Sequence, residues 1–317
     1  MSINCKICGQ KTTTGTVQVR SKKTLEIFHC NNCDFDFFDF NPENILIEDK
    51  LDQSRLKAAG LDIPSIDEDF NNGLKQSSSL IESYFNDSDK ERNILEIGCS
   101  WGYFLELIKI NGGNPYGVEL NKVRTKYVNE HLMIPCFGSL EECISQNIKF
   151  KKIYLFYVIE YVYDPLSYFK SLFSLLDDDG EIIFITPNLN DGLKDIWLNE
   201  GFKNFFYDEC AINYFTPQTL KIIFNQIEYS NASIKSNQGY SFLNHVSWHF
   251  TNAPRTTGIV GGDAFMDDLQ GKMAKSQVSF SAVFFNLIES FNLQYKAILE
   301  ENDYGNQIIC RITRSLV

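Results

Sequence analysis

Between residues 93 and 186 the hydrophobic positions follow two alternating patterns. Short apolar runs alternate with segments whose apolar residues recur every three or four positions. The runs predict strands covered on both faces, and the periodic segments predict helices. Strands that alternate with helices in this way are typical of an α/β fold built around a parallel sheet.

Five strands and three helices are expected in this part of the chain. Each strand ends near a glycine or a polar residue, where a loop can carry function. The expected strands lie within 93–97, 115–120, 134–137, 152–165 and 181–186, and the expected helices cover 103–111, 122–132 and 165–176, with a turn at 177–180.

The segments that precede this core show other patterns. Ser65-x-x-Glu68 after Pro64 predicts the start of a helix that runs to Tyr84 or Phe85. Such a helix would either cover the mouth of a site or pack on the sheet. Residues 12–28 alternate like a short hairpin, and residues 34–40 alternate Phe with Asp like a strand that packs on the next domain.

The last 80 or so residues are expected to complete the same sheet. Residues 232–250 read as strand, 280–299 as an apolar amphipathic helix, and 306–313 as a terminal strand. Residues 252–262, rich in Thr and Gly, predict a mobile loop. We therefore expect an insertion at about 250–300 between the last two strands.

Nine cysteines divide into a group of four and five single ones. Cys5-x-x-Cys8 and Cys30-x-x-Cys33 have a spacing close to that of a four-thiolate zinc site, and a closed set of ligands indicates a structural role. A redox pair or four unrelated thiols are the alternatives, and His29 could replace one thiolate. The single cysteines are expected to be reduced and buried: Cys99, Cys136, Cys143, Cys210 and Cys310.

The charge balance limits the possible partners. A net charge of −12 and a pI of about 4.9 repel phosphate backbones and anionic membranes, so nucleic acid is an unlikely partner. The N-terminus has no apolar signal segment, and no run reaches the roughly 18 apolar residues of a spanning helix. We expect a cytoplasmic protein without a membrane partner.

The turn after the first core strand, E-I-G-C-S-W-G from Glu96 to Gly102, is the best candidate for a ligand site. Glycines permit a sharp turn and a close approach of a ligand. The spacing is not the dinucleotide pattern G-x-G-x-x-G, because Ser100 stands at the second glycine. Glu96 would repel a pyrophosphate but suit a cation. Glu119, at the tip of the next strand, can accept both hydroxyls of a ribose.

The turn, Glu119 and the spacing between them resemble the class I S-adenosylmethionine (SAM) methyltransferases. The segments F-Y-V-I-E-Y-V-Y-D-P (156–165) and N-Y-F-T-P-Q-T-L (213–220) are similar to two further segments of that superfamily. The resemblance implies a Rossmann-like sheet of seven strands, the last antiparallel, and SAM as cofactor. It implies these cofactor contacts: Glu96, Gly98, Ser100, Trp101, Gly102, Glu119, Leu120, Ser139, Leu140, Phe156 and Tyr157.

The same resemblance divides the chain into three parts. Residues 1–40 would form a zinc ribbon with four cysteine ligands, residues 41–90 a helical connector or cap, and residues 91–317 the methyltransferase domain with its insertion. An N-terminal ribbon before such a domain is similar to zinc-ribbon methyltransferases that act on sugars.

The general base is not identified by the motifs. Tyr157, Tyr161 and Ala211 stand where the family usually has histidines, and a phenol titrates near 10. His245 and His249, four residues apart, either reach the active-site mouth or are ordinary partly buried histidines. The candidates for catalysis and for shaping the pocket are His245, Glu160, His249, Tyr161 and Tyr214.

The leading interpretation is SAM-dependent methyl transfer to a small molecule. The acceptor would be a sugar or nucleotide-sugar in polysaccharide or secondary-metabolite biosynthesis, with O-, N- and C-methylation all open. An RNA methyltransferase and a non-catalytic, partner-binding protein of the same fold are alternatives, and a nicotinamide oxidoreductase is more distant. An oligomer is possible.

Overall fold

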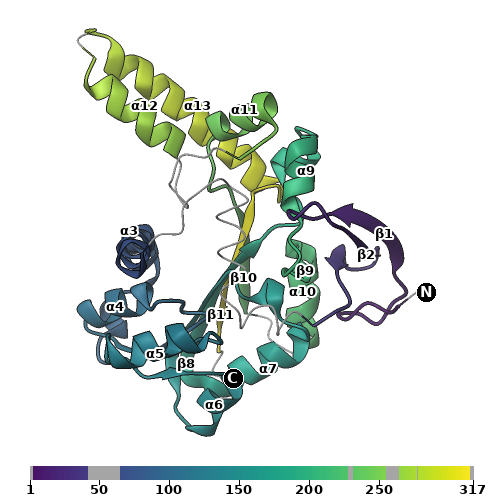
Figure 1. Ribbon diagram of the computed structural model, residues 1–317, viewed down its shortest axis with the longest axis vertical. Coiled ribbons are helices and arrows are strands. Elements are labelled where there is room, and N and C mark those ends of the chain that lie inside the picture. Colours follow the sequence, from purple (N-terminus) through teal and green to yellow (C-terminus); the bar gives the residue numbers. More distant parts are fainter. Residues whose placement is uncertain (1–2, 42–64, 228–230, 255–263, 277, 315–317) are drawn as a thin grey trace.

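The computed structural model describes residues 3–41, 65–227, 231–254, 264–276 and 278–314 (Figure 1). Most of the first half of the predicted connector and most of the predicted loop at 252–262 lie outside the described residues. The described strands form two sheets, one of seven strands and one of four. None of the described helices has both the length and the apolar character needed to cross a membrane.

The large sheet has the strand order β10, β11, β8, β7, β4, β5, β6. The four pairs from β8 to β6 are parallel, whereas β11 is antiparallel to both β8 and β10. The predicted seven-stranded α/β sheet with an antiparallel last strand is therefore confirmed. Its strands are β4 (Asn93–Ile97), β5 (Asn114–Val118), β6 (Cys136–Phe137), β7 (Phe150–Phe156), β8 (Leu176–Pro187), β10 (Ala232–Asn237) and β11 (Gln307–Thr313).

Helices cover both faces of this sheet. Alternate residues of the central strands point to opposite faces, so that Ile94 and Leu95 belong to two different cores. One core contains the helices α3, α4 and α5, and the other contains α6, α7 and α10. The bounds are α3 (Ile66–Tyr84), α4 (Tyr103–Ile110), α5 (Lys122–Glu130), α6 (Leu140–Ser145), α7 (Pro165–Leu175) and α10 (Pro217–Gln226).

The helix predicted after Ser65 is α3, and its capping box is confirmed. The Ser65 side chain accepts a hydrogen bond from the Glu68 amide, and the Glu68 carboxylate accepts one from the Ser65 amide. The helix packs on α4, where Gly73 lies against the ring of Tyr103. A β-carbon at Gly73 would lie 2.3 Å from that ring, so this contact depends on the glycine.

The small sheet joins the N-terminal ribbon to the large domain. Its antiparallel strands are β1 (Thr13–Gln18), β2 (Thr24–Cys30), β3 (Phe35–Phe37) and β9 (Asn213–Tyr214). Strand β9 is more than 170 residues after β3 in the sequence. Phe35 is fully buried, and its ring centroid lies 5.3 Å from that of Phe215. The ribbon and the large domain thus share one sheet and one apolar core.

The segment after β10 differs from the prediction. The strand expected over 232–250 ends at Asn237, and residues 242–251 form the helix α11 (Phe242–Thr251). Ser241 caps this helix by accepting a hydrogen bond from the Asn244 amide at 3.2 Å. His245 and Trp248 are buried and lie three positions apart, a helical spacing that the strand prediction overlooked.

Two further helices lie between α11 and the last strand. They are α12 (Ala264–Ala274) and α13 (Ser281–Glu301), which pack on each other and project away from the sheet (Figure 1). The helix predicted over 280–299 is confirmed as α13. Strand β8 starts at Leu176, so the residues predicted as a turn at 177–180 belong to its first part.

Four short helices complete the described part of the chain, and three of them follow β7 and β8. These three are the 3-10 helix η2 (Ile159–Tyr161), which follows β7, and α8 (Gly192–Asp195) and α9 (Glu200–Phe206), which follow β8. Another 3-10 helix, η1 (Asp87–Asp89), precedes β4. The loops after β4, β5, β7 and β8 all leave the same edge of the sheet, the edge at which α/β sheets bind ligands.

Candidate functional site

The glycine turn between β4 and α4 has a backbone that most residues avoid. Gly98, Ser100 and Gly102 have φ values of 73°, 51° and 80°. A β-carbon at Gly98 would lie 2.7 Å from Val158, and one at Gly102 would lie 2.8 Å from Leu132. Both glycines are therefore required by conformation and by space, and Gly98 itself is exposed at the edge of the sheet.

Glu119 bridges the turn and the tip of β5. One of its carboxylate oxygens accepts a hydrogen bond from the Ser100 amide at 2.9 Å, and the other accepts one from the Asn121 amide at 2.8 Å. A carboxylate offers about four lone-pair sites, so each oxygen keeps a further acceptor position. The two amides thus fix the carboxylate in one orientation, which suits recognition of two neighbouring hydroxyls.

Glu96 lies beneath the same turn and is buried. Its Oε2 atom has no hydrogen-bond partner among the described residues. Burial raises the pKa of this carboxyl well above its usual range, and the nearby Cys136 and Glu119 raise it further. A buried acceptor of this kind needs a donor, and a cationic or hydrogen-bonding ligand in the turn would provide one.

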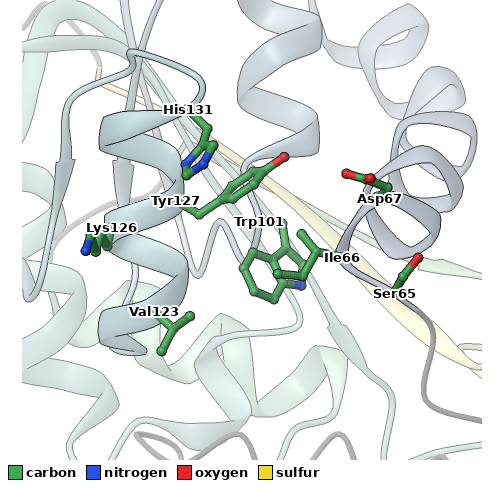
Figure 2. A pocket seen from close by; sticks show the side chains of 8 residues that line it. All are labelled: Ser65, Ile66, Asp67, Trp101, Val123, Lys126, Tyr127 and His131. Atoms are coloured by element: carbon green, nitrogen blue, oxygen red, sulfur yellow. The ribbon is translucent and has the colours of Figure 1, made fainter.

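Trp101 connects the turn to a pocket of about 520 Å³ between α3 and α5. Figure 2 shows its indole between the first turn of α3 and the helix α5. The rings of Tyr127 and Trp101 are nearly perpendicular, with centroids 5.3 Å apart. The guanidinium carbon of Arg124 lies 5.5 Å from the centroid of the Trp101 ring. The pocket is lined by Ser65, Ile66, Asp67, Trp101, Val123, Lys126, Tyr127 and His131.

The other predicted cofactor residues lie at the ends of β5, β6 and β7. Leu120 directly follows Glu119. Ser139 caps α6 through the Glu142 amide at 3.2 Å, and the adjacent Leu140 is buried. Phe156, which ends β7, packs edge-on against Phe104 of α4 at 5.2 Å. These strands are parallel to β4, which lies between β7 and β5, so the assigned residues lie along one edge of the sheet. Their role as cofactor contacts stays a prediction.

Tyr157 marks the next part of this edge. It has a φ of 57°, its side chain is 47% exposed, and its hydroxyl is hydrogen bonded to the side chain of Gln307. Gln307 in turn donates to the Asn237 side chain at 2.6 Å. Gln307 is not among the site residues predicted from the sequence. The antiparallel direction of β11 is the signal that could have identified it, because this direction brings the first residue of the strand to the ligand edge.

His245 is surrounded by protein. It is 1% exposed, and its ring nitrogens are hydrogen bonded to the hydroxyl of Tyr295 at 2.5 Å and to the Gln238 side chain at 3.2 Å. Burial lowers the pKa of the imidazole to about 4, with a further contribution from Lys296. His249, one turn later, is exposed, and the edge of its ring faces Trp197.

The remaining catalytic candidates lie on or beside η2. Glu160 is buried, and its Oε2 atom accepts a hydrogen bond from the Thr186 hydroxyl at 3.1 Å. Tyr161 is half-buried and packs with the aromatic cluster around Tyr214. The Tyr214 hydroxyl is buried and hydrogen bonded to the Asp208 backbone, and burial raises its pKa well above 10. Catalytic roles for these residues, and for His245 and His249, stay predictions.

The four grouped cysteines come together in the ribbon. Their sulfur atoms all lie within 4.8 Å of one another, and four of the separations are 3.3–3.4 Å. A zinc ion with Zn–S bonds of about 2.3 Å needs sulfur atoms only a few tenths of an ångström farther apart than these separations, so the donor set Cys5, Cys8, Cys30 and Cys33 fits this ion. His29 is bound elsewhere, with its Nδ1 atom 2.6 Å from Asp36.

The chain is similar to known methyltransferases. The sequence model of the methyltransferase domain family matches residues 72–234. The juvenile hormone acid O-methyltransferase of Bombyx mori is 23% identical over 104 residues, which cover 29% of this chain and 37% of that protein. The chain therefore matches well under half the length of this curated relative.

Two solved methyltransferase structures are similar to this chain. A SAM-dependent methyltransferase from Archaeoglobus fulgidus is 17% identical, with 78% of this chain and 96% of that chain covered and a TM-score of 0.47. The plantazolicin methyltransferase BpumL, solved in complex with SAH, is 12% identical, with 86% and 93% covered and a TM-score of 0.46.

The family match includes the glycine turn, Glu119, the end of β7 and all of α10. It covers slightly more than half of the 317 residues. The chain belongs to the methyltransferase domain family, which confirms the methyltransferase family expected from its motifs.

Proposed function

We propose that the protein transfers the methyl group of SAM to an uncharged, polar small molecule, with a sugar or nucleotide-sugar as the best-fitting class. The observation that carries the proposal is the pair of acidic residues at the glycine turn. Glu119 is held by two backbone amides, and Glu96 keeps a buried oxygen without a partner among the described residues. SAM offers both a ribose diol and a positive charge to such a pair.

In this proposal the chain's own residues hold and align the donor. Glu119 accepts the two ribose hydroxyls, and the exposed Gly98 lets the ligand approach the backbone. Glu96 supports the cationic end of the ligand through its unpaired oxygen. SAM supplies an activated methyl group, so the protein mainly positions the acceptor and excludes water.

The proposed acceptor site lies beside the cofactor turn, where β7 and β8 end and β11 begins. Tyr157 and Gln307 form a neutral, hydrogen-bonded pair, and the Gly239 amide donates to the Asn306 side chain at 2.6 Å. Amide and phenol groups exchange hydrogen bonds with hydroxyls at little desolvation cost, and an exposed ring can cover the face of a sugar. The neutral pair supports an uncharged acceptor, since the charged groups beside it, Lys296 and Glu300, are each hydrogen bonded to the backbone of residues 238–239.

We further propose that the four ribbon cysteines hold a structural zinc ion. The set is closed, because four thiolates satisfy a tetrahedral ion and leave no position for substrate. Three of the four cysteines are buried, which favours stable retention of the ion.

The test is a transfer assay with SAM labelled at its methyl group. Nucleotide-sugars, free sugars, small carboxylic acids, amines and total RNA are offered separately, and labelled product is measured. We expect label in a nucleotide-sugar or sugar, and none in RNA because of the net charge of −12. Label that enters only an acid, an amine or RNA would overturn the acceptor class and leave SAM dependence intact.

A variant separates acceptor recognition from cofactor binding. Gln307→Leu removes the partner of Tyr157, so the acceptor KM should rise about tenfold while the Kd for SAM stays within about twofold. Lys235→Leu, an exposed residue within β10, is the matched control and should change neither value. Equal values of KM in Gln307→Leu and wild type would contradict the proposed acceptor site.

A further inference from the structure

Helix α13 carries two apolar stripes, one packed and one largely exposed, and in the exposed stripe Phe291 also contacts Phe242 of α11 with ring centroids 4.9 Å apart. The packed stripe contains Phe285, Ile288, Tyr295 and Leu299, of which Leu299 is buried and the others are half-buried. The second stripe is displaced by one residue, which is about 100° around the helix. It consists of Phe280, Phe284, Leu287, Phe291 and Ile298, which are 64%, 48%, 67%, 51% and 62% exposed.

The exposed stripe is comparable in size to the largest apolar patches on monomers, which are often functional. Five large side chains that are about half exposed or more present roughly 500 Å² of apolar surface, at the upper end of what monomers show. With the flanking Val283, 71% exposed, and the polar rim, one helix face approaches the roughly 800 Å² that each partner buries in a standard interface.

The spacing of the stripe matches a helix partner. Phe280, Phe284, Leu287 and Phe291 are separated by four, three and four residues, which is the heptad spacing of a coiled-coil seam. The hairpin of α12 and α13 projects away from the large sheet (Figure 1). Pairing of α13 with a second helix therefore leaves the large sheets of the two molecules apart.

We propose that α13 pairs with α13 of a second copy of this chain in an antiparallel dimer. A two-fold axis between positions 285 and 286 places Phe284 of one copy against Leu287 of the other, and Phe280 against Phe291. All four positions of the seam then meet an apolar residue, and the interface is self-complementary as two-fold symmetry requires.

Charge favours a second copy over an anionic partner. The net charge of −12 repels nucleic acid and anionic membranes. The same charge would also oppose association of two copies, but Glu289 is the one charged residue of the sequence between positions 281 and 290. The seam is therefore locally almost neutral, and the charges of the two domains are screened beyond about 8 Å at physiological salt.

Sedimentation velocity of the full-length protein tests the proposal. We expect a dimer at micromolar concentration. Phe284→Glu with Leu287→Glu places four carboxylates in the two central layers and should raise the dimer Kd at least about 100-fold. Leu293→Glu, on the same helix, 62% exposed and off the stripe, is the matched control and should leave the dimer unchanged.

The register is tested by cross-linking. Single variants Phe280→Cys and Phe291→Cys should not form a disulfide-linked dimer alone, because equal positions lie about 16 Å apart along the paired helices. A mixture of the two variants should form one under mild oxidation. Unchanged far-ultraviolet circular dichroism of the variants shows that their fold is intact.

Three outcomes would overturn the proposal. They are a wild-type monomer at 50 to 100 micromolar or so, a dimer that persists in the double Glu variant, and cross-linking of each single variant with itself. A monomer that binds neutral phosphatidylcholine vesicles through this stripe would replace the second copy with a lipid surface.

Discussion

At the scale of single residues, the site contains two carboxylates, Glu119 and Glu96, with different surroundings. Glu119 accepts two backbone hydrogen bonds at the edge of the sheet, while Glu96 is buried with one unpaired oxygen and a raised pKa. The first is ordered by the protein alone. The unpaired oxygen of Glu96 lowers the stability of the fold when no ligand is bound. A buried acceptor without a partner is typical of a functional site.

The first prediction concerns Gly98. A β-carbon there meets Val158 at 2.7 Å, and the φ of 73° is strained for alanine, so Gly98→Ala should lower the free energy of unfolding by about 1–3 kcal/mol and abolish SAM binding. Gly271→Ala, in α12 with nothing within 4 Å of the added carbon, is the control and should be neutral or slightly stabilising. Chemical denaturation measures both. Equal stability of Gly98→Ala and wild type would contradict this account of the turn.

The residues that sequence reasoning identified are those whose chemistry is local. A glycine in a turn and an acid at the tip of a strand are visible in the sequence, because neighbouring residues determine their conformation. Gln307 was missed because its importance depends on the direction of β11 and on its pairing with Tyr157, a residue 150 positions earlier.

At the scale of elements, α11 shows how burial changes a histidine. His245 is hydrogen bonded to Tyr295 of α13 and to Gln238, and these contacts join the helices to the end of β10. The spacing of two histidines suggested a base near the mouth of the site. The structure shows why such a spacing is ambiguous, since a histidine on the buried face of a helix has the same spacing as one that faces a ligand.

The second prediction is a pH dependence from this helix packing. The folded pKa of about 4 lies below the usual value of 6.5, so the stabilisation is complete above pH 6.5 and is lost as the pH falls toward 4. Between pH 7 and pH 5 this loss is up to about 2 kcal/mol. His245→Gln should show a smaller loss over the same range, measured by urea unfolding.

The exposed His249 provides the control for this experiment, because His249→Gln should keep the wild-type pH dependence. Parallel curves for wild type and His245→Gln between pH 7 and pH 5 would mean that the imidazole does not titrate as its burial requires.

Element boundaries also show what the sequence determines. The capping box predicted the start of α3, because both of its hydrogen bonds are local. The strand expected over 232–250 was wrong after Asn237, because apolar residues in that segment satisfy a strand and a helix equally, and the Ser241 cap decides between them. The apolar character of α13 was predicted, but the exposure of one of its stripes depends on which neighbours pack against it.

At the scale of the whole molecule, the ribbon is structurally part of the methyltransferase domain. The Thr219 hydroxyl donates to the backbone oxygen of Cys33 at 2.9 Å, and the Thr216 hydroxyl donates to that of Asp34 at 3.1 Å. Both threonines cap α10, and β9 pairs with β3 just before them. The second cysteine knuckle is thus held by the T-P-Q-T segment at residues 216–219, which lies within the family match.

The third prediction follows from this junction. The purified protein should contain one zinc ion per chain, and its removal by a chelator or by Cys33→Ser should lower the Tm of the entire molecule by at least roughly 5 °C in a single transition. Cys143→Ser, outside the ribbon, should keep the metal. Two separate transitions, with the upper one unchanged by the chelator, would show that the ribbon folds independently.

The central claim is that the glycine turn and Glu119 bind SAM, and isothermal titration calorimetry tests it most directly. Wild-type protein should bind SAM and its demethylated product but not NAD. Glu119→Ala should weaken both at least about 100-fold, because two hydrogen bonds to a charged group are lost, while the surface control Glu130→Ala should not. No binding of either sulfur ligand, or equal affinity in Glu119→Ala and wild type, would contradict the account.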